Sequence, residues 1–509
     1  MKTTLRTARY LLLALLLSRC GPDGGAPPRG SLHGACRADD TCNSGLVCSD
    51  GTCVLDYLNM DGGPGQDGVG IRDSVHEGRP ARPDLWSAVD GAPPTPPAPW
   101  AATIAGPFPV LRASGVAVRG NEVLLVGQGV PAGKMATDLV LIKMQASGAV
   151  VWQKIIDTGG GDYGGDVAAV SSGGYLIAGQ SNAKIWLVRI GGGGQALWQR
   201  TYADAGKDAT SASRVLATSD GGFLVVGNSY TWSEVAEENI LVFKVNTTGT
   251  LLWHRRLEGP GGLFVRGAAL LHNGGVAVVG THDQGSNKAV FVVRLTASGG
   301  IEWAKRLDGP DWDLGVDVAE APGQELVVLG STRSFGAGQN DLWLLRLGGA
   351  GDLVSQSVLG GPGNDTGERL YAVGSELLVT GGTTSSGAKS VDLFAAKLSA
   401  AGKPAWQVRL GEVGWDYGAG SALVPGGGVY LFADTDVGEG QFHWIAGVID
   451  AKGAMPPGCA LAAATSMTVG TSAAQVTSLL LKEVAAAVSH SDVTAPPLSL
   501  STQLSMQCQ

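Results

Sequence analysis

Tryptophan recurs along this chain at intervals of 46 to 55 residues, and this spacing constrains the fold more than any other feature of the sequence. The positions in register are Trp100, Trp152, Trp198, Trp253, Trp303, Ser355 and Trp406, so serine replaces tryptophan once. A repeat of this length indicates an array of equivalent structural units, each of which buries its apolar face against its neighbours.

Two apolar runs keep phase with the tryptophans. The first ends in glycine in six units, at Leu124–Gly127, Leu176–Gly179, Leu224–Gly227, Ala277–Gly280, Val327–Gly330 and Leu378–Gly381, and in alanine in a seventh, Tyr430–Ala433. The second run begins at Asp138, Lys184, Asn239, Ala289, Asp341, Asp392 and Phe442. Short runs between turns rich in Gly, Ser and Asp predict β-strands. The 79 glycines of the chain suit many tight turns.

These signals predict an all-β fold, a seven-bladed β-propeller over residues 100–459 with four short antiparallel strands in each blade. The last pair of runs is followed by Met455–Gly458, which contains two prolines where a tryptophan strand is due. Proline does not occur within a central β-ladder. Trp100 begins the array without a strand before it. We therefore expect the Trp100 strand to complete the seventh blade and close the ring.

Three segments carry a resemblance to a known family. They are Leu359–Asp365, Gly381–Ser386 and Asp392–Leu398. Their sequence resembles the bacterial β-propeller repeat family often called SBBP, which occurs in exported and surface proteins. The resemblance covers residues 100–459 and implies the fold, but it implies no chemistry, because one fold hosts many functions.

The first twenty residues, 1–20, are typical of an export signal. A basic start precedes an apolar run, Tyr10–Leu17, that is too short to span a bilayer. The run ends in Leu17–Cys20, which resembles the bacterial lipobox, so we expect lipidation of Cys20. Arg19 stands where Gly, Ala or Ser is usual, and a signal without lipidation remains the alternative. Either route predicts an exported protein, at the outer membrane or cell surface or free outside the cell.

The seven cysteines agree with export. Once Cys20 is set aside, six remain and can pair completely in an oxidising compartment. Cys36, Cys42, Cys48 and Cys53 lie in a compact segment, residues 33–53, that can form two disulfides in any of three connectivities. Zinc is the alternative, but paired C-x2-C spacings are lacking. We expect Cys459 to pair with Cys508.

Two further segments flank the array. Residues 54–99 form a linker rich in glycine and proline, which would hold the folded domain away from a membrane surface. Residues 460–509 form a tail in which Ser and Thr alternate with Val and Leu, around a possible short helix near Val476–Val488. The predicted pair Cys459 and Cys508 would tie this tail to the propeller.

Charged residues also recur in phase. A basic residue stands nine positions before the tryptophan register, at Lys143, Arg189, Lys244, Arg294, Arg346 and Lys397, and an aspartate stands ten positions after it, at Asp162, Asp208, Asp313, Asp365 and Asp416. The structural interpretation is that the aspartate caps a turn or pairs with the basic residue. The functional interpretation is a charged ring that captures an ionic ligand.

Composition and motifs limit the function. The net charge is −9 and no Lys/Arg-rich run occurs, which disfavours a nucleic-acid partner. Neither G-x-S-x-G nor H-E-x-x-H is present, and no cofactor or metal is expected. Tyr230, Trp232, His282 and Asp283 lie near predicted loops and are the candidate ligand-binding residues.

We therefore expect a monomeric, non-enzymatic interaction module that is lipid-anchored or otherwise exported and binds a protein or glycan at the cell envelope. One alternative is a glycan hydrolase or lyase that uses carboxylates in the propeller channel. Another is a purely structural envelope protein.

Overall fold

The computed structural model describes residues 46–49, 52–55 and 96–508, with gaps in the last range at 107, 109, 132, 135, 233–236, 286, 386–387, 389, 412–413, 439–440, 457–458, 460–461, 465–466, 471, 480–481, 485–487, 493–497 and 500–502. The export signal, Cys20, Cys36, Cys42 and nearly all of the linker fall outside these residues. Contacts divide the chain into two units, Met1–Gly70 and Ile71–Gln509.

In the first unit, β1 (Leu46–Ser49) pairs antiparallel with β2 (Thr52–Leu55). Cys48 stands opposite Cys53 in this ladder. The disulfides expected in residues 33–53 remain predictions.

The second unit is all-β and consists of four-stranded antiparallel sheets that follow one another along the chain. The strands of the first three sheets are β4 (Val110–Arg119), β5 (Glu122–Val130), β6 (Asp138–Gln145) and β7 (Val150–Ile156); β8 (Asp162–Ala169), β9 (Tyr175–Ser181), β10 (Lys184–Ile190) and β11 (Ala196–Asp204); and β12 (Ala209–Ala217), β13 (Phe223–Thr231), β14 (Glu237–Val245) and β15 (Leu251–Glu258). Short apolar stretches bounded by turn glycines give each strand its length.

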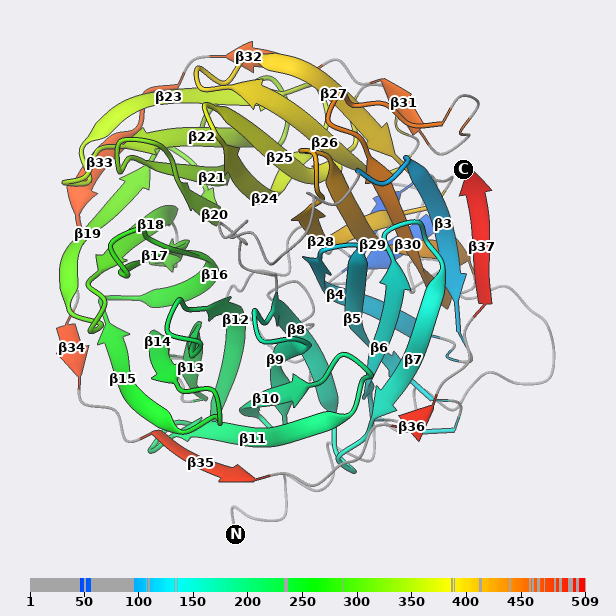
Figure 1. The fold of residues 1–509 in the computed structure, drawn as a ribbon. Helices are drawn as coiled ribbons and strands as arrows, with labels where there is room; N and C mark the ends of the chain where they lie inside the picture. The colour runs from blue at the N-terminus through cyan, green and yellow to red at the C-terminus, as the bar shows by residue number, and fades with distance from the viewer. Residues whose placement is uncertain are drawn as a thin grey trace, which may run out of the picture. The chain divides into compact units, whose positions relative to one another are not determined.

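The next three sheets repeat the pattern. They contain β16 (Gly262–Leu270), β17 (Val276–Asp283), β18 (Lys288–Leu295) and β19 (Ile301–Asp308); β20 (Asp313–Glu320), β21 (Leu326–Thr332), β22 (Asp341–Leu347) and β23 (Leu353–Gly360); and β24 (Asp365–Val373), β25 (Glu376–Thr383), β26 (Asp392–Ser399) and β27 (Pro404–Leu410). Three further strands follow, β28 (Asp416–Leu423), β29 (Val429–Gly438) and β30 (Gln441–Ile449). The sheets surround a common centre, with the first strand of each innermost (Figure 1). This is a β-propeller-like fold.

An early strand, β3 (Trp100–Ala105), pairs with this last group. It runs antiparallel to β30, with Trp100 opposite Val448. A single residue pair, Phe442 and Val110, also joins β30 to β4. Hydrogen bonds therefore connect β28 to β30, β3, β4 to β7 and two strands of the C-terminal tail into one ten-stranded sheet.

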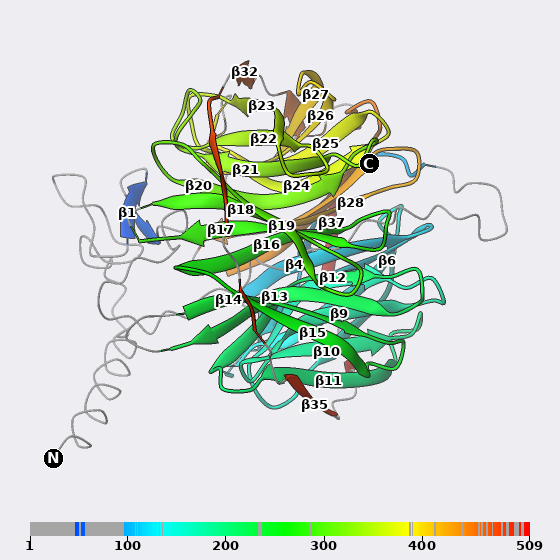
Figure 2. The ribbon, with the colours of Figure 1, turned by 90° about the vertical axis from the view of Figure 1, so that its left-hand side faces the viewer.

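Tail strands lie on the outer side of the sheets (Figures 1 and 2). They are β31 (Ala462–Ala464), β32 (Thr468–Gly470), β33 (Gln475–Ser478), β34 (Lys482–Val484), β35 (Val488–Asp492), β36 (Leu498–Ser499) and β37 (Gln503–Cys508). The expected helix near Val476–Val488 is wrong, because β33, β34 and β35 occupy this stretch. In β33 exposure alternates along the chain, with Gln475 and Thr477 exposed and Val476 half-buried, which is the two-residue period of a strand.

The recurrent tryptophans connect neighbouring sheets. The indole Nε1 of Trp152 donates to Gly192 O at 3.0 Å, and that of Trp198 donates to Thr247 O at 3.0 Å, in each case in a turn of the following sheet. Where Ser355 replaces tryptophan, Arg346 stands opposite it and donates instead to Ala400 O, again in the following sheet. The tryptophan register is therefore a register of contacts between sheets.

The core lies between the faces of adjacent sheets rather than within one closed barrel. One buried cluster joins Leu124 and Leu139 of one sheet to Trp186 and Val188 of the next. In the described part of the chain, no helix is long and apolar enough to cross a membrane.

Candidate functional site

One end of the sheets carries the segments that contain the predicted ligand-binding residues. We call it the loop face. At this end the second strand of a sheet turns into the third, and the chain passes from one sheet into the first strand of the next. The two kinds of segment meet where the main-chain N–H of Trp232 donates to the carboxylate of Asp208.

Trp232 is the most solvent-exposed of the predicted residues. It follows β13, and 65% of its surface is accessible, the highest value among the exposed large apolar residues of the described chain. Tyr230, two residues earlier, is half-buried, and its hydroxyl lies 2.8 Å from Ser211 Oγ. Trp232 therefore offers an aromatic surface to solvent, whereas Tyr230 contributes to the packing of β13 on β12.

His282 and Asp283 are held by local contacts. His282 is 1% exposed, its Nε2 contacts Pro260 O, and burial lowers its pKa. Asp283 accepts a bond of 2.7 Å from Gly285 N and lies 3.6 Å from Lys288 Nζ. A buried imidazole and a turn-capping carboxylate are poorly placed for direct ligand contact. Their ligand-binding role stays a prediction.

Two tryptophans of the loop face were not among the predicted residues. Trp312 precedes β20, with Lys288 Nζ 4.6 Å and the Arg333 guanidinium carbon 5.2 Å from its ring centroid. Trp415 precedes β28 and stacks on Tyr417, with ring centroids 5.7 Å apart. Both are half-buried. Their positions in the sequence could have indicated them, because each stands immediately before a recurrent aspartate and outside the tryptophan register.

The recurrent aspartates close turns on the loop face. Asp313 accepts bonds from Gly309 N at 2.6 Å and Ser334 Oγ at 2.9 Å. Burial raises the pKa of Asp313. The recurrent basic residues are paired elsewhere, as Lys143 is with Glu122 at 2.7 Å. The capping interpretation therefore accounts for Asp313, and the basic residue of the preceding sheet is not its partner.

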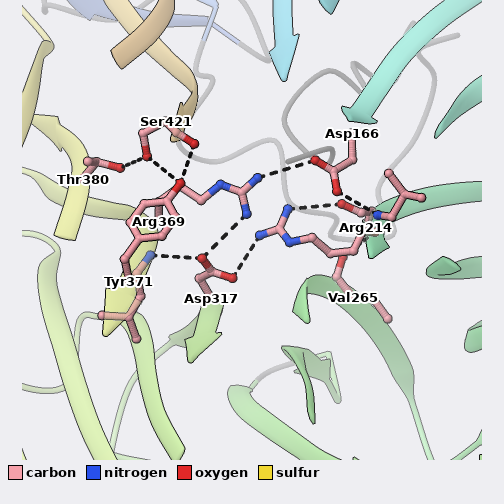
Figure 3. Close-up of polar contacts among 11 residues, drawn as sticks. Asp166, Arg214, Val265, Asp317, Arg369, Tyr371, Thr380 and Ser421 are labelled. Atoms are coloured by element: carbon pink, nitrogen blue, oxygen red, sulfur yellow. Dashed lines mark hydrogen bonds and ion pairs between the residues drawn. The ribbon is translucent and has the colours of Figure 1, made fainter. Parts of the chain in front are cut away.

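A second cluster lies among the innermost strands, where Asp166, Arg214, Asp317 and Arg369 project toward one another from β8, β12, β20 and β24 (Figure 3). Each follows a register shift in its strand. Such β-bulges redirect side chains. We call these four residues the axial cluster. The corresponding position in β16 is Gly267, where a Cβ atom would lie 2.7 Å from Asp317 Oδ1.

The axial cluster is an ion-pair network between sheets. Arg214 Nη2 lies 3.1 Å from Asp317 Oδ1. Arg369 Nη1 lies 3.7 Å from Asp317 Oδ2, and Arg369 Nη2 lies 3.8 Å from Asp166 Oδ1. Each aspartate also accepts a main-chain bond from another sheet, Asp166 from Val215 N at 2.8 Å and Asp317 from Leu370 N at 3.0 Å. The network therefore links four sheets.

Burial governs the charges of this cluster. It raises the pKa of Asp166 to about 6 and lowers that of Arg369 to about 10. Two arginines offset two aspartates, so the cluster is balanced in charge. Nearby, burial raises the pKa of Tyr371, whose hydroxyl donates to Ser421 O. These groups are equipped to join sheets, because their carboxylates face arginines rather than an open channel.

A pocket of about 360 Å³ lies at the opposite end of the sheets from the loop face. His272 and Glu320 line it, with Nδ1 and Oε1 2.8 Å apart, beside the turn residues Ala321–Gln324. Among the described residues, no group of three or more His, Cys, Asp or Glu side chains is arranged to hold a metal ion.

Comparison with known proteins shows likeness of fold. No family model matches the chain, and a search of curated proteins finds no relative. Solved structures that resemble it include a protein of unknown function from Dyadobacter fermentans, with 12% identity, a TM-score of 0.38 and 69% of this chain and 97% of that one covered. The phage phi92 endosialidase has 9% identity and a TM-score of 0.36, with 69% of this chain and 69% of that one covered. The Pyrococcus horikoshii acylaminoacyl peptidase has 10% identity and a TM-score of 0.38, with 64% of this chain and 49% of that one covered.

The likeness to these structures concerns the β-propeller-like fold alone. At such identities and TM-scores it carries no argument about ligand or activity. These structures support the β-propeller-like fold that the SBBP resemblance implies, and membership of the SBBP repeat family stays a prediction.

Proposed function

We propose that this chain is an exported, lipid-anchored binding protein in which a seven-bladed β-propeller presents a ligand site on the loop face. The observation that carries the proposal is the 65% exposure of Trp232. Large exposed aromatic side chains contribute strongly to binding when a partner covers them. Half-buried Trp312 and Trp415 extend the aromatic character of this face.

The blade count rests on contacts that repeat between sheets. If β3 serves as the fourth strand beside β28, β29 and β30, each of seven units has four strands. Trp100 Nε1 then donates to Ala146 O, at 2.8 Å, as Trp152 does to Gly192 O in the following sheet. The innermost strands β28 and β4 are also in contact. These contacts favour a ring closed by the Trp100 strand.

The alternative of a glycan hydrolase or lyase has less support. That chemistry needs one carboxyl group to donate a proton and another to act as base or nucleophile, both beside the substrate. Asp166 and Asp317 are buried against arginines. Placing substrate between them would break ion pairs that join sheets. A purely structural envelope protein would have no use for an exposed Trp232.

The anchor and the partner come from the sequence. The lipobox-like Cys20 favours attachment to a membrane by lipid. The class of partner that we propose is a protein or glycan of the cell envelope, bound by one monomer. Metabolic labelling with a fatty-acid analogue should mark the full chain, and Cys20→Ser should abolish the label.

The binding proposal is tested with the full chain on a glycan array and against envelope proteins. Trp232→Ala should weaken binding of any captured partner at least tenfold, about 1.4 kcal/mol or more. Leu252→Ala is the matched control, because Leu252 is 53% exposed on an outer strand away from the loop face. It should bind as the parent does.

Equal binding by Trp232→Ala and the parent would refute the role of this residue. Release of shortened glycan products during the screen would favour the hydrolase or lyase. Both variants should keep the parent thermal unfolding temperature, since neither side chain is buried.

A further inference from the structure

The C-terminal tail contacts the sheets in the reverse of their order along the chain. β31 pairs with β27, β32 with β23, β33 with β19, β34 with β15, β35 with β11, β36 with β7 and β37 with β3. Each tail strand therefore adds to the outer strand of one sheet (Figure 1).

Side chains of the tail also enter the seams between sheets. Met467 is buried among residues of β21, β22, β25 and β26, and Leu479 is buried among residues of β13, β14, β17 and β18. Between them, Ser472 Oγ accepts from Trp343 Nε1 at 3.0 Å and donates to Gln356 Oε1 at 2.8 Å. The tail is therefore hydrogen-bonded to the sheets and packed into their core, and it forms a structural part of them.

The two ends of the tail return to the same place. Cys459 is buried in a cluster that contains Ala101 of β3. Cys508 of β37 stands opposite that same Ala101 in the β3–β37 ladder. The first residue of this stretch therefore belongs to the buried cluster that includes Ala101, and its last strand pairs with the strand that contains Ala101.

We propose that the tail strands β31 to β37 form a belt around the outside of the sheets, closed by a Cys459–Cys508 disulfide. The inference rests on the seven-bladed arrangement proposed above. Closure oxidises two thiols to one disulfide and passes two electrons and two protons to a disulfide oxidant of the exporting compartment, which becomes a dithiol. The closed belt covers strand edges that would otherwise be open to pairing with other chains.

This geometry makes the belt sensitive to redox state. Its strands are short, from two to six residues, so each pairing is weak alone. The disulfide prevents the tail from peeling off one sheet at a time. Reduction removes the covalent tie at the Cys508 end and leaves β37 paired with β3 through its ladder.

A protease site in place of residues 493–497, between β35 and β36, tests the closed belt in the full chain. After cleavage, the oxidised protein should remain one band on a denaturing non-reducing gel and lose its C-terminal fragment on reduction. With Cys508→Ser, the fragment should separate without reductant. Separation from the oxidised parent without reductant would overturn the inference.

A second measurement tests the belt as a fastener. The Cys459→Ser/Cys508→Ser double variant should lower the unfolding temperature of the sheets by roughly 5–10 °C. It should also increase hydrogen exchange in the outer strands. Cys48→Ser/Cys53→Ser, in the first unit, is the matched control and should leave both unchanged. Equal exchange in both double variants would contradict the belt, whatever the outcome of the Trp232 binding test.

Discussion

The main-chain N–H of Ala113, in β4, donates a hydrogen bond to the carboxylate of Asp434, in β29, which lies 321 positions further along the chain. The same kind of bond joins other neighbouring sheets: Val265 N donates to Asn228 Oδ1 at 2.9 Å. Asp434 directly follows Ala433, the alanine that replaces the recurrent glycine, and Asn228 directly follows Gly227. The bond between Ala113 and Asp434 therefore has the same form as the bond between Val265 and Asn228 of successive sheets, which supports the proposed closure of the ring.

Asp434→Ala should destabilise the fold by about 2–4 kcal/mol, because it leaves the buried Ala113 N–H without its acceptor and removes the carboxylate that faces Arg112. Asp434→Asn keeps an acceptor oxygen and should lose less. Urea unfolding of the two variants measures the difference. Equal losses would show that the bond to Ala113 contributes nothing.

Breaking the Arg214–Asp317 pair should cost about 3–5 kcal/mol, because either single substitution leaves a buried charge. The Arg214→Met/Asp317→Leu double variant should recover part of that loss, since both charges leave together. The Lys244–Asp220 pair is the control, with the Asp220 side chain 54% exposed, and Asp220→Asn should cost at most about 1 kcal/mol. Additive effects at Arg214 and Asp317 would contradict a coupled pair.

Asp166 should make stability depend on pH. Its pKa is about 6 in the folded chain against an ordinary 3.8, so between pH 4 and 6 the folded chain holds a proton that the unfolded chain has released. Its contribution to the free energy of unfolding is therefore complete below pH 4 and falls by about 3 kcal/mol as pH rises through 6. Asp166→Asn should remove this fall.

Urea unfolding of the parent and Asp166→Asn at pH 4, 5, 6 and 7 measures the effect. Asp220→Asn serves as the control, because Lys244 lowers the pKa of Asp220 to about 2, outside this range. Parallel pH profiles for the parent and Asp166→Asn would rule out a buried titrating group at this position.

Asp365→Ala should cost about 3 kcal/mol, because the buried carboxylate accepts from Gly361 N at 2.7 Å, Thr383 Oγ1 at 2.5 Å and Ser385 Oγ at 2.8 Å. Asp208 occupies the same register but is exposed. Asp208→Ala should cost less than about 1 kcal/mol. Thermal unfolding compares the two, and a larger effect at Asp208 would contradict the capping role.

The sheets could be predicted because their signals repeat. Lys143 stands nine residues before Trp152 because the two are directly opposite in neighbouring strands. The repeated spacing of glycine-ended runs likewise marks the second strands, such as β5 and β9. A feature present in every unit is recognisable from spacing alone.

Features that differ between units could not be predicted in the same way. The axial cluster takes Asp166, Arg214, Asp317 and Arg369 from positions that are glycine in other sheets, and only the bulged backbone brings them together. The tail strands were harder still to predict, since each is short and pairs with a strand that is distant in the sequence. Its alternating pattern was visible, but the sheets that it joins were not.

The proposed seven-bladed propeller requires β3 to close the ring, and a cross-link tests this closure directly. In a chain that begins at residue 96 and carries Cys459→Ser and Cys508→Ser, Ala102→Cys and Ala446→Cys introduce the only cysteines, on paired residues of β3 and β30. Paired antiparallel residues are close enough for a disulfide. The variant should form this bond on oxidation, seen as increased mobility on a non-reducing gel. Ala102→Cys with Ala395→Cys, on β26 of the neighbouring sheet, should not. A bond in the control pair and none between residues 102 and 446 would contradict the closed ring.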